Sequence, residues 1–262
     1  MPLLLVIATS APQLTTLIFT CPPVPIPVLL TRPMKDDLSY NLIELRGRIA
    51  DACEKYHRDT DDITIVAVTK KWPVSVVRTA VAAGLHDIGE NRIQEAEPKI
   101  TELGPIARFH LVGHLQSNKV PKAVALFDVI QSVDSLDLAE EISRRVSKLG
   151  RTIHCLVQVN CSGEESKHGA SPESALDLIR QISQLPAISL SGVMTIGPLT
   201  DDEDRIRAAF RTCREIFQRG QDIVGEHFDT LSMGMSDDFP LAIAEGSTMI
   251  RVGTALFGVR ST

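Results

Sequence analysis

The first part of the chain lacks charge, since no Asp, Glu, Lys or Arg occurs before Arg32. A secretory signal peptide begins with basic residues, which are missing here. Pro12, Pro22 and Pro23 interrupt the apolar runs, so none reaches the ~20 residues that a membrane-spanning helix needs. We expect residues 1–33 to form a disordered extension, with a targeting segment as the alternative. The expected location is cytoplasmic in the first case and mitochondrial in the second.

Disulfide and nucleotide-binding signals are also missing. The five cysteines are odd in number, scattered and without a C-x-x-C pair, which indicates free thiols in a reducing compartment. No G-x-G-x-x-G follows the first predicted strand, and no P-loop or G-x-S-x-G motif occurs. The formal net charge is −6, and no basic stripe with interleaved aromatics is present. We therefore expect neither a nucleic-acid nor a membrane partner.

Metal-ligand spacing is missing as well. His110 and His114 are four residues apart in a predicted strand, which separates them by ~13 Å along it. That distance is too long for two ligands of one ion. No other spacing of His, Cys and carboxylate residues resembles a metal-binding motif. The sequence predicts no metal site.

What the chain does have, from Lys35 onward, is a regular alternation of strand and helix patterns. Short apolar runs rich in β-branched residues alternate with segments whose apolar residues recur at helical spacing. Eight such pairs match a single (β/α)8 TIM barrel, which we assign to residues 34–262 with a helix over 38–57 in front of it. An open doubly wound sheet is the alternative. The predicted strands are 63–70, 85–90, 108–113, 128–134, 152–160, 188–197, 227–234 and 248–258.

The carboxyl ends of these strands are where such barrels place their chemistry. The first strand ends in Lys70 and Lys71, and an amine at that position can form a Schiff base. The residues alone leave open which lysine reacts, or whether both are solvated strand ends. Gly253 and Thr254 in the last strand, with Ser232 in the strand before, form a cluster typical of phosphate binding in barrels.

Arg251 is the one charged residue inside the last predicted strand. A charge at a buried position needs a partner. The sequence leaves open whether Arg251 forms a structural ion pair or reaches a ligand.

Six segments together resemble one known family. They are AVTKKWP, GENRIQE, HLVGHLQSNK, QVNCSGEESKHG, GVMTIG and LSMGMSDDFPLAIAEGSTMIRVGTALFG. They resemble the YggS/PROSC family, the pyridoxal phosphate homeostasis proteins, over about residues 36–258. The resemblance implies a barrel like the N-terminal domain of bacterial alanine racemase, with pyridoxal 5′-phosphate (PLP) as the cofactor.

The resemblance also implies roles for particular residues. The family's Schiff-base lysine stands three residues before a proline, so Pro73 points to Lys70. Asn91 is implied beside the cofactor ring and Arg251 at the pyridine nitrogen, where an arginine leaves the ring a weaker electron sink than a carboxylate would. The residues implied around the phosphate are Ser232, Gly253 and Thr254.

The implied function is PLP binding on Lys70 and a part in intracellular PLP homeostasis, without established catalytic turnover. The alternative is a PLP-dependent racemase or lyase with Lys70 as base, and a cofactor-free Schiff-base aldolase is a third hypothesis. The chain ends four residues after Gly258, and its two tyrosines, Tyr40 and Tyr56, precede the barrel. We therefore expect the racemase's second domain and second base to be absent. The expected partners are PLP and PLP-dependent apoenzymes, and the expected state is a monomer or weak dimer.

Overall fold

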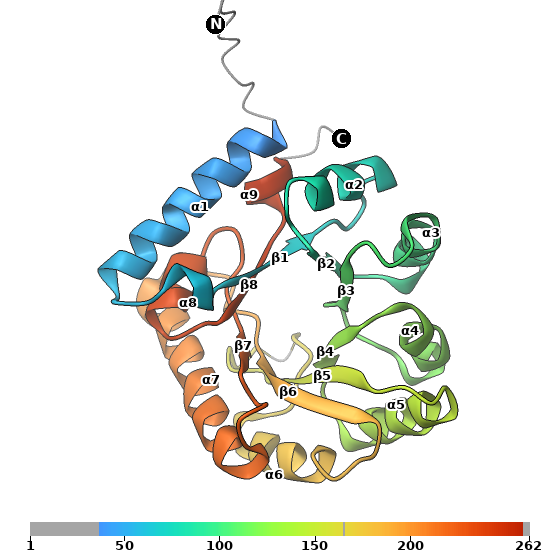
Figure 1. Ribbon diagram of the computed structural model, residues 1–262. Coiled ribbons are helices and arrows are strands. Elements are labelled where there is room, and N and C mark those ends of the chain that lie inside the picture. The colour runs from blue at the N-terminus through green and yellow to red at the C-terminus, as the bar shows by residue number, and fades with distance from the viewer. Residues whose placement is uncertain (1–36, 165, 259–262) are drawn as a thin grey trace, which may run out of the picture. The chain divides into compact units, whose positions relative to one another are not determined.

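Eight parallel strands form a closed barrel in chain order in the computed structural model, which is described for residues 37–164 and 166–258 (Figure 1). β8 pairs with β1 and so closes the sheet. The (β/α)8 prediction is confirmed, and the open-sheet alternative is wrong. The predicted extension over 1–33 lies outside the described residues. The strands are β1 (Thr64–Val68), β2 (Asp87–Glu90), β3 (Arg108–Leu111), β4 (Val129–Val133), β5 (Ile153–Gln158), β6 (Ile188–Met194), β7 (Thr230–Ser232) and β8 (Met249–Val252).

Helices surround this barrel and bury its outer face (Figure 1). None of the described helices is long and apolar enough to cross a membrane. The α-helices are α1 (Leu38–Lys55), α2 (Val74–Ala82), α3 (Ile93–Leu103), α4 (Val120–Leu126), α5 (Leu136–Lys148), α6 (Pro172–Ile182), α7 (Glu203–Val224), α8 (Phe239–Ala244) and α9 (Thr254–Phe257). The described residues also form two short 3₁₀ helices, η1 (Thr60–Asp62) and η2 (Ser117–Lys119).

The longest helix, α7, shows why the sequence forms these elements. The Asp202 side chain accepts hydrogen bonds from the N–H groups of Asp204 and Arg205, which caps the first turn. Ile206, Phe210, Cys213 and Phe217 recur at helical spacing and are buried against the barrel.

α1 precedes the barrel and lies beside α8 and α9 (Figure 1). Its buried residues Leu42, Leu45 and Ile49 form one stripe of the helix. Asn41 Nδ2 donates to the Leu256 carbonyl over 2.9 Å. The helix predicted over 38–57 is confirmed, although it ends at Lys55, and it packs against the helices of the last two βα units.

The last predicted strand, over 248–258, is too long and is corrected by the structure. β8 ends at Val252, and Thr254–Phe257 forms the short helix α9. The N–H groups of Leu256 and Phe257 both donate to the Gly253 carbonyl, over 3.0 and 2.9 Å, so their backbone bonds close a helical turn instead of extending the sheet. The predicted strand over 63–70 also ends early, at Val68.

Candidate cofactor-binding site

Lys70 lies in the turn that follows β1, and its side chain is exposed at the carboxyl end of the barrel. Thr69 before it is fully buried, and its N–H donates to the Gly89 carbonyl over 2.9 Å. Lys71 after it has a φ of 61°, and its N–H donates to Glu95 Oε2 over 2.9 Å. The backbone is thus fixed on both sides of Lys70, while its amine faces solvent.

The neighbours of β1 in the sheet determine what surrounds Lys70. β1 lies between β2 and β8, so Asn91 follows the strand on one side and Gly253 the strand on the other. A Cβ added at Gly253 would lie 3.2 Å from the Val68 carbonyl oxygen. Glycine therefore allows the end of β8 to lie close against the end of β1, near Lys70.

Backbone donors converge directly after β8. The N–H groups of Gly253 and Ala255 both donate to Ser236 Oγ, over 3.3 and 3.2 Å. Two N–H groups aimed at one oxygen are the kind of donor set that a phosphate oxygen accepts. Thr254, predicted to lie in a strand, is instead the first residue of α9. Ser236 belongs to the same polar segment at the end of β7 as Ser232, and Ser236 is the hydroxyl that contacts Gly253.

Arg251 points into the barrel and is 5% exposed. Its Nη1 donates to Ser232 Oγ over 2.7 Å, and its Nη2 donates to the Thr195 carbonyl over 2.7 Å. Thr195 follows β6, which is not adjacent to β8 in the sheet, so the second bond crosses the interior. Burial lowers the pKa of the guanidinium to about 10, against the raising effect of the nearby Asp238 carboxylate. Arg251 therefore remains a cation at neutral pH.

A chain of buried hydrogen bonds continues from Ser232 through the barrel. Ser232 Oγ donates to Gln131 Oε1 over 2.8 Å. Gln131 Nε2 lies 2.9 Å from His110 Nδ1, and His110 Nε2 lies 2.8 Å from Asp87 Oδ1. One set of roles satisfies every group: the amide donates to Nδ1 of a neutral imidazole, which donates from Nε2 to the carboxylate.

Burial accounts for the charge state of His110. Desolvation lowers its pKa below the ordinary value, and the hydrogen bond to Asp87 opposes this only in part. His110 is therefore neutral at neutral pH, as its contact with the Gln131 amide requires. The series of hydrogen bonds thus joins the Arg251 cation to the Asp87 carboxylate through neutral, fully buried groups.

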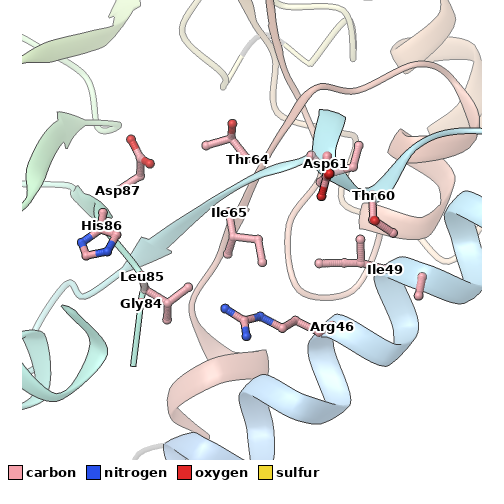
Figure 2. A pocket seen from close by; sticks show the side chains of 12 residues that line it. Arg46, Ile49, Thr60, Asp61, Thr64, Ile65, Gly84, Leu85, His86 and Asp87 are labelled. Atoms are coloured by element: carbon pink, nitrogen blue, oxygen red, sulfur yellow. The ribbon is translucent and has the colours of Figure 1, made fainter. Parts of the chain in front are cut away.

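The far end of this chain meets a cavity of about 610 Å³ at the amino ends of the strands. Figure 2 shows Asp87 and His86 on its β2 side and Arg46 on its α1 side. This cavity contains none of the predicted cofactor residues. Because such barrels carry their chemistry at the opposite end, the mouth around Lys70 is the better cofactor site.

A second buried polar group supports Lys70 from outside the barrel. Lys99 of α3 donates to Glu90 Oε1 over 2.6 Å and to the Thr69 carbonyl over 2.7 Å. Thr69 Oγ1 donates to the same Glu90 oxygen over 2.6 Å. This cluster fixes the backbone directly before Lys70.

Comparison with known proteins adds to this geometry. The family described as alanine racemase, N-terminal domain, matches residues 46–261. The pyridoxal phosphate homeostasis protein of Haemophilus influenzae is 37% identical over 229 residues, which are 86% of this chain and 97% of the relative. The chain belongs to the pyridoxal phosphate homeostasis protein family. The resemblance drawn from the six sequence segments is thereby confirmed.

Solved structures agree with this family membership. PipY of Synechococcus elongatus, solved with PLP bound, is 38% identical with a TM-score of 0.74, over 85% of this chain and 100% of PipY. An alanine racemase of Clostridium difficile, in complex with cycloserine, has a TM-score of 0.71 at 18% identity, over 87% of this chain and 61% of the racemase. The second likeness shows the shared barrel fold alone.

The structure brings the predicted residues of this family site to one end of the barrel. Lys70, Asn91, Gly253 and Thr254 follow adjacent strands there, and Arg251 lies below them in the interior. Sequence reasoning missed the supporting groups Lys99, Glu90, Gln131 and His110. The only available signal was a charged or polar residue inside an apolar strand or helix pattern, which does not identify its partner.

Proposed function

We propose that this chain binds PLP at the mouth of the barrel through a Schiff base on Lys70 and takes part in the homeostasis of that cofactor. The observation that carries the proposal is an exposed lysine directly after β1, next to the strand β8, which contains the buried Arg251 and is followed by converging backbone N–H groups. PipY, 38% identical and covered over its full length, is solved with PLP bound.

The residues of the site fit the parts of this ligand. Lys70 supplies the amine, and the backbone around it is held by Thr69 and Lys71. We assign the phosphate to Gly253 and Thr254, with the Ala255 N–H as a further donor. Ser232 remains a prediction for this group, since its hydroxyl here donates to Gln131 and accepts from Arg251.

Arg251 and Asn91 are assigned to the ring. A guanidinium donates hydrogen bonds and accepts none, so Arg251 favours an unprotonated pyridine nitrogen. PLP supplies an electron sink when bound, and this partner makes it a weaker one. The site therefore suits retention of the cofactor better than carbanion chemistry.

The tyrosines bear on the alternative of a racemase. Tyr56 stands at the end of α1, and its hydroxyl accepts a hydrogen bond from Arg207 Nη2 of α7 over 2.9 Å. A two-base racemase needs a second acid or base opposite the lysine. The engagement of Tyr56 by α7 supports a binding protein without turnover, and a one-base racemase or lyase is the alternative to test.

The decisive experiment compares the two adjacent lysines. After incubation with PLP and desalting, wild-type protein is expected to keep the visible absorption of bound PLP, and Lys70→Ala is expected to lose it. Lys71→Asn is the matched control, because Asn tolerates the positive φ at that position. Borohydride reduction and peptide mass mapping are expected to place one pyridoxyl phosphate on Lys70.

Two results would contradict the proposal. If wild-type protein binds no added PLP, both the PLP-binding protein and the PLP-dependent enzyme are excluded, and the aldolase hypothesis is favoured. Steady racemisation or cleavage of L-amino acids by the loaded protein, lost in Lys70→Ala, favours the enzyme.

A further inference from the structure

Three metal-ligating side chains meet at the mouth of the barrel, outside the residues assigned to PLP. His114 follows β3, Asp134 follows β4, and His168 lies in the loop after β5. One ligand atom of each lies within 4.8 Å of the other two. The sequence predicts no metal site because it shows only intervals along the chain, whereas these residues come from three neighbouring strand ends.

The side chains of this cluster already contact one another. His114 Nδ1 lies 3.6 Å from Asp134 Oδ2. The rings of His114 and His168 stack with their centroids 3.8 Å apart and their planes 9° from parallel. The Asp134 side chain is 17% exposed, so it is the most buried member of the cluster.

The backbone that carries these residues is held in place. A Cβ at Gly113 would lie 2.2 Å from the Asn91 carbonyl oxygen, so only glycine allows the chain before His114 to approach this closely. On the other side, Gln158 Nε2 donates to the His168 carbonyl over 2.8 Å. The N–H of Asn160 donates to the Ala170 carbonyl over 2.9 Å. The two histidines are thus presented from fixed positions.

We propose that His114, Asp134 and His168 bind one divalent ion of the zinc class. Two imidazoles and one carboxylate are a donor set that Zn²⁺ prefers, and sites with three protein ligands keep a further coordination position open. Tetrahedral bonds of about 2.0–2.1 Å place ligand atoms roughly 3.3 Å apart. The His114–Asp134 pair is close to that separation.

One side chain has to move for the ion to bind. A metal lies near the plane of each imidazole that coordinates it, and two parallel rings 3.8 Å apart cannot both meet that condition. His168 is exposed, so its ring can change rotamer without disturbing the core. Asp134 and His114 then form the fixed part of the site, and His168 completes it.

The cluster borders open space on its His114 side. His114 lines a cavity of about 460 Å³ together with Asn91 and Lys119. An ion at His114 therefore has room for a water or an anionic donor from solvent. This binding is independent of PLP, so it can hold whether or not the proposed function does.

The test measures metal binding without added PLP. After treatment with a chelator, the full chain is titrated with Zn²⁺ by calorimetry. We expect one Zn²⁺ per chain, and affinity at least tenfold lower in each of His114→Ala, Asp134→Asn and His168→Ala. His227→Ala, an exposed histidine before β7, is the matched control and should bind as wild type does. Circular dichroism checks the fold of each variant.

Anomalous diffraction at the zinc edge provides a second measurement. A peak bounded by His114, Asp134 and His168 is the expected result. Absence of Zn²⁺ binding by wild-type protein overturns the proposal. So does binding that the three ligand variants leave at the level of His227→Ala.

Discussion

Arg251 and Lys99 are both buried cations, 5% and 7% exposed, on opposite faces of the barrel wall. Lys99 lies between the sheet and α3, where Glu90 Oε1 is 2.6 Å from its Nζ. Arg251 lies inside the barrel and has no carboxylate within ion-pair distance among residues 37–164 and 166–258. Its two described hydrogen bonds go to a hydroxyl and a backbone carbonyl.

The difference separates a structural charge from one that is available to a ligand. The charge of Lys99 is balanced where it lies, so Lys99 has little left to offer a third group. Arg251 makes no ion pair among the described residues, and the Asp238 carboxylate acts on its charge from a longer distance. Its hydrogen bonds lead through Ser232, Gln131 and His110 to the distant Asp87 carboxylate. Isolated buried charge is costly, and its retention beside Lys70 supports a role in binding the cofactor.

The largest expected effect on folding is that of Lys99→Met. This change leaves Glu90 fully buried without its cation, and removal of one partner from a buried pair typically costs about 3–5 kcal/mol. Urea unfolding measures the loss. The second change Glu90→Gln should recover much of it, because the uncompensated charge disappears.

Lys122→Met is the matched control for Lys99→Met. Lys122 pairs with Glu97 at the surface, with side-chain exposures of 60% and 44%, and such pairs contribute about 0–1 kcal/mol. If Lys99→Met costs no more than Lys122→Met, the assignment of Lys99 to a buried structural pair is wrong.

Arg251→Glu is expected to act on the cofactor, in addition to the cost of placing a carboxylate inside the barrel. A carboxylate there favours a protonated ring nitrogen, so the visible spectrum of bound PLP should change. PLP retention after desalting should fall at least tenfold, about 1.4 kcal/mol. Arg251→Gln, which keeps a donor but no charge, should lie between wild type and Arg251→Glu. An unchanged spectrum and retention in Arg251→Glu would remove Arg251 from the proposed site.

Much of the fold could be predicted from the sequence because its signals are local. Alternating apolar patterns and helix caps such as Asp202 depend on neighbours in the chain, and they identified eight βα units. The error at the last strand has a local cause too. Residues 248–258 are apolar enough for a strand, and only the hydrogen bonds of Leu256 and Phe257 to the Gly253 carbonyl show the helix α9.

The candidate site also contains residues that the sequence could predict and contacts that it could not. Lys70, Asn91 and Gly253 follow strands, so the barrel itself predicted their shared location. The Thr195 carbonyl could not be predicted as a partner of Arg251, because it follows β6, which is not adjacent to β8 in the sheet. In the same way, Ser232 of β7 meets Gln131 of β4, and these strands are not adjacent either. Their contact exists only across the closed interior, and no sequence interval encodes that distance.

The smallest expected effect is on how the free energy of unfolding depends on pH, which tests the hydrogen bonds between Arg251 and Asp87. Burial holds the pKa of folded His110 below its ordinary value, while the unfolded chain titrates near ~6.5. Between these two pKa values the unfolded state binds more protons, so the free energy of unfolding falls as pH drops below about 6.5. One group can contribute at most about 1.4 kcal/mol per pH unit.

His110→Gln removes this titration but keeps a donor and an acceptor for Asp87 and Gln131. Urea unfolding at pH 7.5 and 5.5 should therefore show a smaller loss of stability in the variant than in wild type. His227→Gln is the control, because His227 is exposed and takes no part in these hydrogen bonds. Equal pH dependence in wild type and His110→Gln would contradict a neutral His110. A protonated His110 would present a donor to Gln131, so the Gln131 amide would have to be reversed to offer its oxygen. Ser232 would then lose the acceptor that orients it toward Arg251.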